Sequence, residues 1–157
     1  SIGINRNDVM TLIQMRPEGE PIQWLAFASN AFNVLAPFYT DIETTPGYLS
    51  GTTGKVSTEN FYWMSRMIAA MADASYSKSV FHIERYQEKV AAKSHELLNR
   101  YDILLEQETD EETRKKIQEE ANEKIAGMLQ CEATDTLDKV LYELSGQMKN
   151  AYARSDA

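Results

Sequence analysis

The chain has 157 residues, of which 43% are hydrophobic and 25% charged, and its formal net charge is −8. The length predicts one domain with a sizeable core, and the acidic balance argues against nucleic acid and anionic membranes as partners, since both select for clustered Lys and Arg. The single cysteine, Cys131, excludes an internal disulfide and fits a reducing cytoplasm, and no apolar run reaches the roughly 18 residues that span a bilayer.

The first third of the chain predicts antiparallel β-structure. Residues 9–15 form an apolar run with Thr and Gln interruptions, and residues 22–28 form a nearly continuous apolar run. Between them, residues 16–21 hold two prolines and one glycine, which is typical of a turn, so the two runs predict a hairpin. The continuous run of 22–28 indicates that both of its faces are covered. A lone hairpin is marginal in water, so a helix or a larger sheet has to pack against it.

The next segment, residues 29–56, is predicted to connect this hairpin to helices. Its first part, 29–41, is rich in Asn and aromatic residues, and 41–56 holds three glycines and one proline. Asn30 and Asn33 lie beside large apolar residues and need hydrogen-bond partners if they are buried. These asparagines either cap turns through bonds to the backbone or present amide donors toward a substrate carbonyl or oxyanion.

Helical periodicity dominates from residue 57 onward. Ser57 is predicted to cap a helix that ends near residues 75–77, and a second helix is predicted over about 78–106. The first helix carries apolar residues at helical spacing, namely Phe61, Met64, Ile68 and Met71.

Two further helices are predicted after residue 106. Thr109 and Glu112 form the capping-box pattern of a charged helix that reaches about residue 129, and Thr134 or Asp135 is predicted to cap a last helix. The tail, residues 152–157, is expected to fray. The sequence therefore predicts an α+β chain, with antiparallel strands first and a mostly helical second part.

Few residues in the chain suit catalysis or metal binding. The two histidines, His82 and His95, are thirteen positions apart on one predicted helix and do not share a face as a metal-binding pair would, so no metal and no cofactor are predicted. Cys131 lies between two predicted helices beside Glu132, and an acidic neighbour lowers the reactivity of a thiol. We therefore expect a semi-buried structural cysteine at a helix junction.

A long block of uncommon residue types runs from Ser29 to Asp73, after a strand that ends in a Gln-x-Arg-Pro motif. The block contains, in order, Ser29-Asn30, Asn33, Pro37-Phe38-Tyr39, Thr45-Pro46, Tyr48-Leu49, Lys55-Val56-Ser57-Thr58, Asn60-Phe61-Tyr62-Trp63 and Ala72-Asp73. This pattern resembles the C-terminal part of bacterial cysteine dipeptidases of the dipeptidase A type, in the N-terminal-nucleophile hydrolase superfamily.

The resemblance implies that residues 1–56 belong to the core of a four-layer αββα sandwich and that residues 57–157 are the helical part of the same domain. It also implies hydrolysis of dipeptides by a cysteine at the mature N-terminus, whose own α-amino group acts as the base. Asn30 first and Asn33 second are then candidates for oxyanion or substrate binding. Arg16 is a candidate for the substrate carboxylate, with a surface arginine beside a turn as its alternative.

This chain departs from the family at its start, because the expected cysteine lies upstream of it. Residues 1–4 suggest a strand rather than an N-terminal nucleophile at Ser1. We therefore expect the C-terminal portion of a dipeptidase, inactive alone, with dipeptides, the N-terminal part of the enzyme and further copies in a homo-oligomer as partners. Two alternatives stay open: a non-catalytic helical binding or assembly module, and an amidase of the penicillin- or bile-salt-acylase type.

Overall fold

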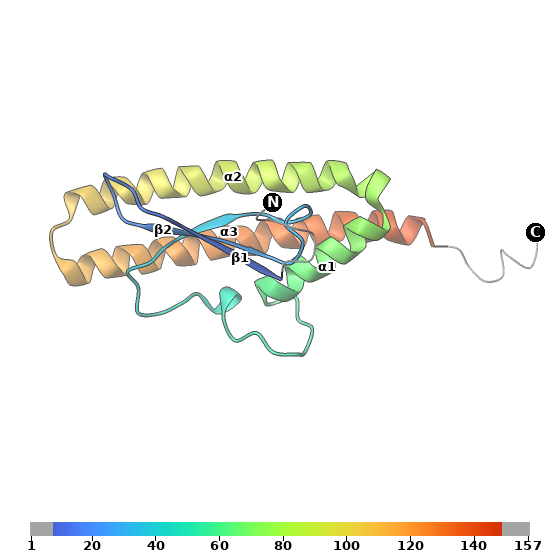
Figure 1. The fold of residues 1–157 in the computed structure, drawn as a ribbon, viewed down its shortest axis with the longest axis horizontal. Helices are drawn as coiled ribbons and strands as arrows, with labels where there is room; N and C mark the ends of the chain where they lie inside the picture. The colour runs from blue at the N-terminus through green and yellow to red at the C-terminus, as the bar shows by residue number, and fades with distance from the viewer. Residues whose placement is uncertain (1–7, 149–157) are drawn as a thin grey trace, which may run out of the picture.

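The computed structural model describes residues 8–148, and it has the α+β arrangement that the sequence predicts. Within that range a three-stranded antiparallel sheet comes first and three helices follow, of which the last two lie side by side (Figure 1). The elements are β1 (Val9–Gln14), β2 (Ile22–Phe27), β3 (Ala36–Tyr39), the 3-10 turn η1 (Gly47–Leu49), α1 (Phe61–Ala74), α2 (Tyr76–Gln107) and α3 (Glu111–Gly146). The strand start expected at residues 1–4 and the frayed tail expected at 152–157 lie outside the described residues.

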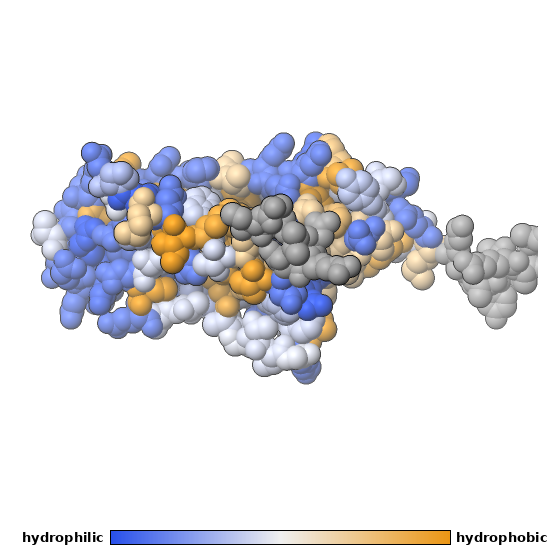
Figure 2. Space-filling model, viewed as in Figure 1, coloured by the Kyte–Doolittle hydropathy of each residue, from blue (hydrophilic) through white to orange (hydrophobic). Residues whose placement is uncertain are grey.

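The predicted hairpin is confirmed. β1 and β2 pair antiparallel from Val9 opposite Phe27 to Gln14 opposite Ile22. One face of β2 is buried through Ile22 and Ala26, but the side chains of its other face are only half-buried and β1 is exposed over most of its length. The expectation that both faces are covered is therefore wrong within residues 8–148. Figure 2 shows hydrophobic side chains gathered on this exposed side of the molecule.

The segment after β2 contains a third strand that the sequence did not indicate. Residues 36–39 form β3, which pairs with β2 and lies at the edge of the described sheet, where Pro37 is tolerated although it has no N–H to donate. Asn122 of α3 takes the place of a further strand: its Oδ1 accepts from the Tyr39 N–H at 2.8 Å, and its Nδ2 donates to the Tyr39 carbonyl at 3.0 Å. No local pattern over 29–41 indicates this strand, because the partner that completes its edge is a side chain of a distant helix.

The N-cap of helix α1 lies three residues later than predicted. Asn60, not Ser57, is the N-cap, and its Oδ1 accepts from the backbone N–H of Trp63 at 3.3 Å. The Nδ2 of Asn60 also donates to the Ser50 carbonyl and the Thr52 hydroxyl, so the loop before α1 fixes the cap. Most of the predicted apolar stripe is buried, and Met71 packs against the core from a half-buried position.

Helix α3 is one continuous helix where the sequence predicted two. Its N-cap is Asp110, one residue beyond the predicted Thr109. The expected second cap falls in the helix interior, where Asp135 pairs with Lys139 at 2.6 Å and the Thr136 hydroxyl donates to the Glu132 carbonyl at 2.8 Å. Cys131 is consequently exposed on α3 rather than semi-buried at a junction. The prediction failed because capping residues can also find partners inside a helix.

The core lies between the sheet and the helices. β3 contacts both α2 and α3, and β2 contacts α1. Tyr39 of the sheet, Phe61 of α1 and Tyr86 of α2 are among its largest fully buried side chains. This packing places β2 against α1, and β3 against α2 and α3. Of the helices within residues 8–148, none is long and apolar enough to cross a membrane.

Candidate functional site

Residues 28–33, called here the asparagine loop, leave the sheet at the end of β2. Ala28 has a φ of 57°, a left-handed conformation that residues with a Cβ rarely adopt. Its N–H donates to the Asp8 carbonyl at 2.8 Å, and the Phe32 N–H donates to the Ser29 carbonyl at 3.1 Å. Backbone strain of this kind clusters at functional sites, so the shape of this loop is a reason to look for a site there.

Asn33 fixes the asparagine loop to helix α1. Asn33 is only 4% exposed, and its Nδ2 donates to the carbonyls of Ser29 at 3.0 Å and Ser65 at 3.1 Å. An amide nitrogen has two hydrogens, so both donors of Asn33 are used by the backbone. Its Oδ1 is buried without a partner among the described residues. Asn33 as arranged here therefore positions the loop and has no donor left for a ligand.

Gln87 of α2 holds the same loop from the other side. Its Nε2 donates to the carbonyls of Ala31 at 3.3 Å and Asn33 at 3.0 Å. The loop thus lies between α1 and α2, as Figure 1 shows. Sequence reasoning missed Gln87 because it is one polar residue within a long charged helix, and no local pattern distinguishes it.

Asn30 differs from Asn33 in its surroundings. It lies in the turn of the asparagine loop and is half-buried. Among residues 8–148 its side chain forms no hydrogen bond, unlike that of Asn33. Asn30 is therefore the residue of this loop whose amide could act on a substrate oxygen.

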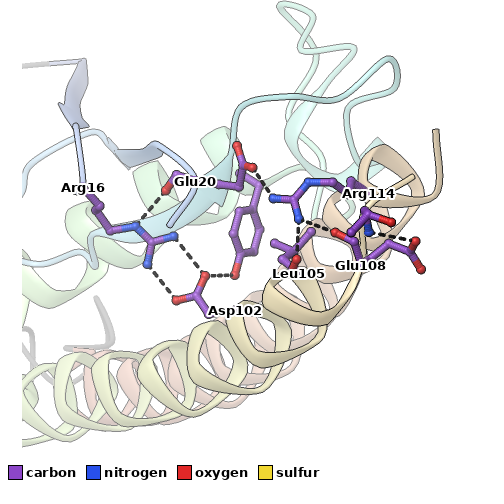
Figure 3. Close-up of polar contacts among 8 residues, drawn as sticks. Arg16, Glu20, Asp102, Leu105, Glu108 and Arg114 are labelled. Carbon is purple, nitrogen blue, oxygen red and sulfur yellow. Dashed lines mark hydrogen bonds and ion pairs between the residues drawn. The ribbon is translucent and has the colours of Figure 1, made fainter. Parts of the chain in front are cut away.

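Arg16 lies at the opposite end of the hairpin from the asparagine loop, close to where Gln14 pairs with Ile22. Its guanidinium forms a bidentate pair with Asp102 of α2, with N–O distances of 2.7 and 2.9 Å, and its Nε donates to the Glu20 carbonyl at 2.7 Å (Figure 3). The hydrogen bonding that Arg16 donates to Asp102 is the largest cause that raises the pKa of Arg16. The structure does not bring Arg16 and the asparagines together.

A second arginine completes this end of the molecule. Arg114 of α3 pairs with Glu20 and donates to the carbonyls of Leu105 and Glu108, as Figure 3 shows. The Tyr39 hydroxyl donates to Asp102 at 2.8 Å. Burial is the largest cause that raises the pKa of Tyr39, and the hydrogen bond to Asp102 is the second. These charges attach the hairpin turn to the α2–α3 end. The side-chain pairs Arg16–Asp102, Tyr39–Asp102 and Arg114–Glu20 join residues 63 to 94 positions apart in sequence, so spacing alone could not predict them.

The residues considered for a metal or a nucleophile lie apart from one another. His82 is 3.3 Å from Glu143, and His95 lies against Trp24 with ring centroids 6.3 Å apart. Across residues 8–148, no group of three or more His, Cys, Asp and Glu side chains is placed to hold a metal ion.

Sequence comparison assigns the family. Residues 1–89 match the pattern of peptidase family C69. The chain belongs to that family. The match includes the asparagine loop and Gln87, and it confirms the resemblance to dipeptidase A-type proteins that the sequence indicates.

Curated relatives of this C69 chain are dipeptidases by name. A dipeptidase of Bifidobacterium longum (strain NCC 2705) is 35% identical over 197 residues, which cover 99% of this chain and 37% of that protein. A probable dipeptidase A of Streptococcus pyogenes serotype M3 is 38% identical over 160 residues, covering 99% of this chain and 33% of that protein. Dipeptidase A of Lactobacillus helveticus is 32% identical over 151 residues, covering 94% and 30%. This chain thus spans about a third of the length of these relatives.

Proposed function

We propose that this chain is the C-terminal portion of a dipeptidase that hydrolyses the amide bond of dipeptides. The observation that carries the proposal is the alignment of nearly the whole chain with proteins named dipeptidase, at 32 to 38% identity. The strained asparagine loop, with one asparagine fixed by backbone carbonyls and another that forms no side-chain hydrogen bond among residues 8–148, adds a geometric reason.

The nucleophile of this proposal is a cysteine at the mature N-terminus of the longer protein. Its α-amino group serves as the base, which satisfies the need for a nucleophile with an adjacent proton acceptor. Cys131 suits that role poorly because it lies within α3 and has no free α-amino group. This portion of the chain contributes substrate binding and oxyanion stabilisation rather than the attacking atom.

Within the site, Asn30 is assigned the role of donor to the oxyanion or the peptide carbonyl. Asn33 and Gln87 are positioning residues, since Asn33 donates to the Ser29 carbonyl of the loop and the Ser65 carbonyl of α1, and Gln87 donates to two loop carbonyls. Arg16 could bind a substrate carboxylate only by releasing Asp102, so the proposal does not place the substrate there.

The open sheet supports a partner for this chain. β1 is exposed on most of its length, and its large apolar side chains are Val9, Leu12, Ile13 and the adjoining Met15. We propose that the N-terminal part of the same enzyme covers this hairpin. Assembly into a homo-oligomer and a place in the cytoplasm complete the proposal, the latter supported by the single cysteine.

The test is dipeptide hydrolysis by the full-length protein and its Asn30→Ala variant. Loss of an oxyanion donor is expected to lower kcat by about 10²- to 10³-fold with little change in folding. Asn99→Ala is the matched control, since Asn99 is an exposed asparagine of α2. Full activity of Asn30→Ala would remove Asn30 from the site, and a full-length protein that cleaves no dipeptide would overturn the proposed function.

A further inference from the structure

Arg66 of α1 lies beside the asparagine loop and is connected to both of its ends. Its Nη1 is 4.0 Å from Oδ1 of Asp8, whose carbonyl accepts from the Ala28 N–H at 2.8 Å, where the loop begins. The residue before it, Ser65, carries the carbonyl to which Asn33 donates at 3.1 Å, where the loop ends. These contacts place a cation next to the loop that carries the proposed oxyanion donor.

Two aromatic rings and one hydrogen bond hold the guanidinium of Arg66 in place. Its Nη1 donates to the Tyr62 hydroxyl at 2.7 Å, and its central carbon is 5.6 Å from the ring centroids of both Tyr62 and Trp63. The ring of Tyr62 is fixed in turn by Phe27 of β2, which it meets edge to face with centroids 5.7 Å apart. The indole of Trp63 is fixed by the Thr53 carbonyl, to which its Nε1 donates at 2.8 Å. An arginine that is already ordered loses little side-chain entropy when it binds a partner.

The charge of Arg66 is less well matched than that of the two arginines at the other end of the hairpin. Arg16 and Arg114 each bind a carboxylate at hydrogen-bond distance, as Figure 3 shows. The ion pair of Arg66 with Asp8 is too long for a hydrogen bond, and the side chains of the two residues are 48% and 74% exposed. Arg66 is therefore ordered by its aromatic neighbours and not by a bound carboxylate within residues 8–148.

The hydrogen bond to Tyr62 also decides which edge of the guanidinium can bind a ligand. It uses Nη1, whereas the edge formed by Nε and Nη2 makes no hydrogen bond to any of residues 8–148. Two parallel N–H groups on one edge match the two oxygens of a carboxylate, which is the geometry of the strongest arginine contacts. The orientation of Arg66 thus suits a carboxylate better than a single carbonyl oxygen.

A dipeptide places a carboxylate close to the bond that is cleaved. One residue, about 3.8 Å of chain, separates the scissile carbonyl from the C-terminal carboxylate. An enzyme that holds this carbonyl at Asn30 therefore needs its cation for the carboxylate beside the same loop. Arg66 meets that requirement, whereas Arg16 lies at the opposite end of the hairpin and is paired with Asp102.

We propose that Arg66 binds the C-terminal carboxylate of the substrate, with Tyr62 and Trp63 as positioning residues. The inference rests on the proposed function and adds the recognition of the free carboxyl end. It explains how such an enzyme would select dipeptides, because a longer peptide presents an uncharged amide where a dipeptide presents its carboxylate.

The experiment compares alanyl-alanine with alanyl-alaninamide, which lacks the carboxylate, as substrates of the full-length protein. Arg66→Gln is expected to lower kcat/KM for alanyl-alanine by about tenfold and to change kcat/KM for the amide by less than about twofold, since only the acid loses a charge-assisted contact. Tyr62→Phe keeps the ring but removes the hydrogen bond that orients Arg66. It should therefore lower the acid-to-amide ratio of kcat/KM by a smaller factor.

Arg85→Gln is the matched control. Arg85 is an exposed arginine of α2 that also stacks on an aromatic ring, with its guanidinium carbon 4.3 Å from the centroid of Phe81. The acid-to-amide ratio should be the same in this variant as in the wild type. Arg66→Lys keeps the charge without the two parallel N–H groups and should retain only part of the preference for the acid.

Calorimetric binding gives a second readout that does not depend on turnover. The probes are the ketomethylene isostere of alanyl-alanine and the C-terminal amide of that isostere. Arg66→Gln should raise the Kd of the acid isostere by about tenfold and leave the Kd of the amide isostere within about twofold. If Arg66→Gln does not fold, Arg66→Lys and Tyr62→Phe serve for the same comparison, because each keeps a cation at this position.

The inference and the proposed function fail in different ways. An active enzyme whose acid-to-amide ratio is the same in the wild type and the Arg66 variants would overturn the role of Arg66 and leave the dipeptidase proposal intact. Equal losses for acid and amide, in turnover and in binding, would show that Arg66 supports the fold and would also contradict the inference. A wild-type protein that hydrolyses no dipeptide would overturn the function itself.

Discussion

The side-chain nitrogen of Asn33 donates to one carbonyl of the asparagine loop and to one carbonyl of α1. This double contact gives a prediction at the scale of one residue. Asn33→Ala leaves the Ser29 and Ser65 carbonyls without their donor in a buried place. We expect a loss of about 2–3 kcal/mol in the free energy of unfolding, measured by urea denaturation. Asn33→Asp should cost more, because it places a carboxylate oxygen where a donor faces two carbonyls.

The same variants distinguish a positioning role from a direct one. If Asn33 only shapes the loop, activity should fall in proportion to the loss of folded protein and of loop order. Normal stability together with lost turnover would show that Asn33 acts on the substrate. Asn99→Ala should leave the free energy of unfolding almost unchanged, since that side chain is exposed.

At the residue scale the sequence indicates Asn30 and Asn33 as candidates but not the contacts that each one makes. Polar residues among large apolar ones need hydrogen-bond partners if they are buried, which is why both could be selected from local composition. The division of roles depends on which carbonyls lie within reach, and Ser65 is 32 positions away from Asn33. Gln87 and Asp102 act over still longer separations, so no local pattern could identify them.

The start of helix α3 gives a prediction at the scale of an element. Asp110 accepts from the N–H and the hydroxyl of Thr113 at 3.1 and 2.6 Å, and these bonds lower the pKa of its carboxyl group. Because the folded pKa lies below the unfolded value, the contact stabilises the protein above about pH 4 and its contribution is lost as the pH falls through the folded pKa. Asp110→Asn keeps a capping side chain but removes the titrating group.

The expected outcome is a difference in stability that depends on pH. Wild type should exceed Asp110→Asn in the free energy of unfolding at neutral pH, and the difference should shrink as the pH drops below about 4. Urea unfolding at several pH values measures it. Asp138→Asn, in an exposed position of the same helix, serves as the control. A difference that is constant from pH 7 to 3 would contradict the role of the Asp110 charge.

Elements whose pattern is long and periodic were predictable, and their boundaries were less so. The hairpin and α2 follow from runs that leave little choice of structure. The break expected near Thr134 was wrong because residues 130–136 contain no glycine or proline, and their polar side chains bond within the helix. β3 was missed because its edge is completed by the side chain of Asn122, a feature of tertiary structure.

At the scale of the whole molecule, the sheet is the feature that sequence and structure describe differently. The apolar run of β2 predicts cover on both faces, yet within residues 8–148 the helices cover one. An apolar residue is expected to be buried in the protein in which the chain normally folds. Relatives of this chain are about three times as long, so they contain further residues that could cover the second face. The discrepancy supports the proposal that the rest of the longer protein packs against the hairpin.

Ile13 of β1 tests that proposal, because its side chain is 69% exposed in this chain but would be covered in the full-length protein. Ile13→Lys should lower the free energy of unfolding of the full-length protein by about 2 kcal/mol or more, since it removes a buried apolar side chain and introduces a charge. Ile103→Lys, at a position 55% exposed on α2, is the matched control and should change it by less than about 0.5 kcal/mol. In residues 1–157 alone, the same Ile13→Lys change should reduce self-association, because a charge on an open apolar strand opposes pairing with another copy. Gel filtration should then show a smaller species for the variant than for the unchanged chain. Equal stability of the two lysine variants in the full-length protein would mean that nothing covers β1, and the N-terminal part of the enzyme would have to contact this chain elsewhere.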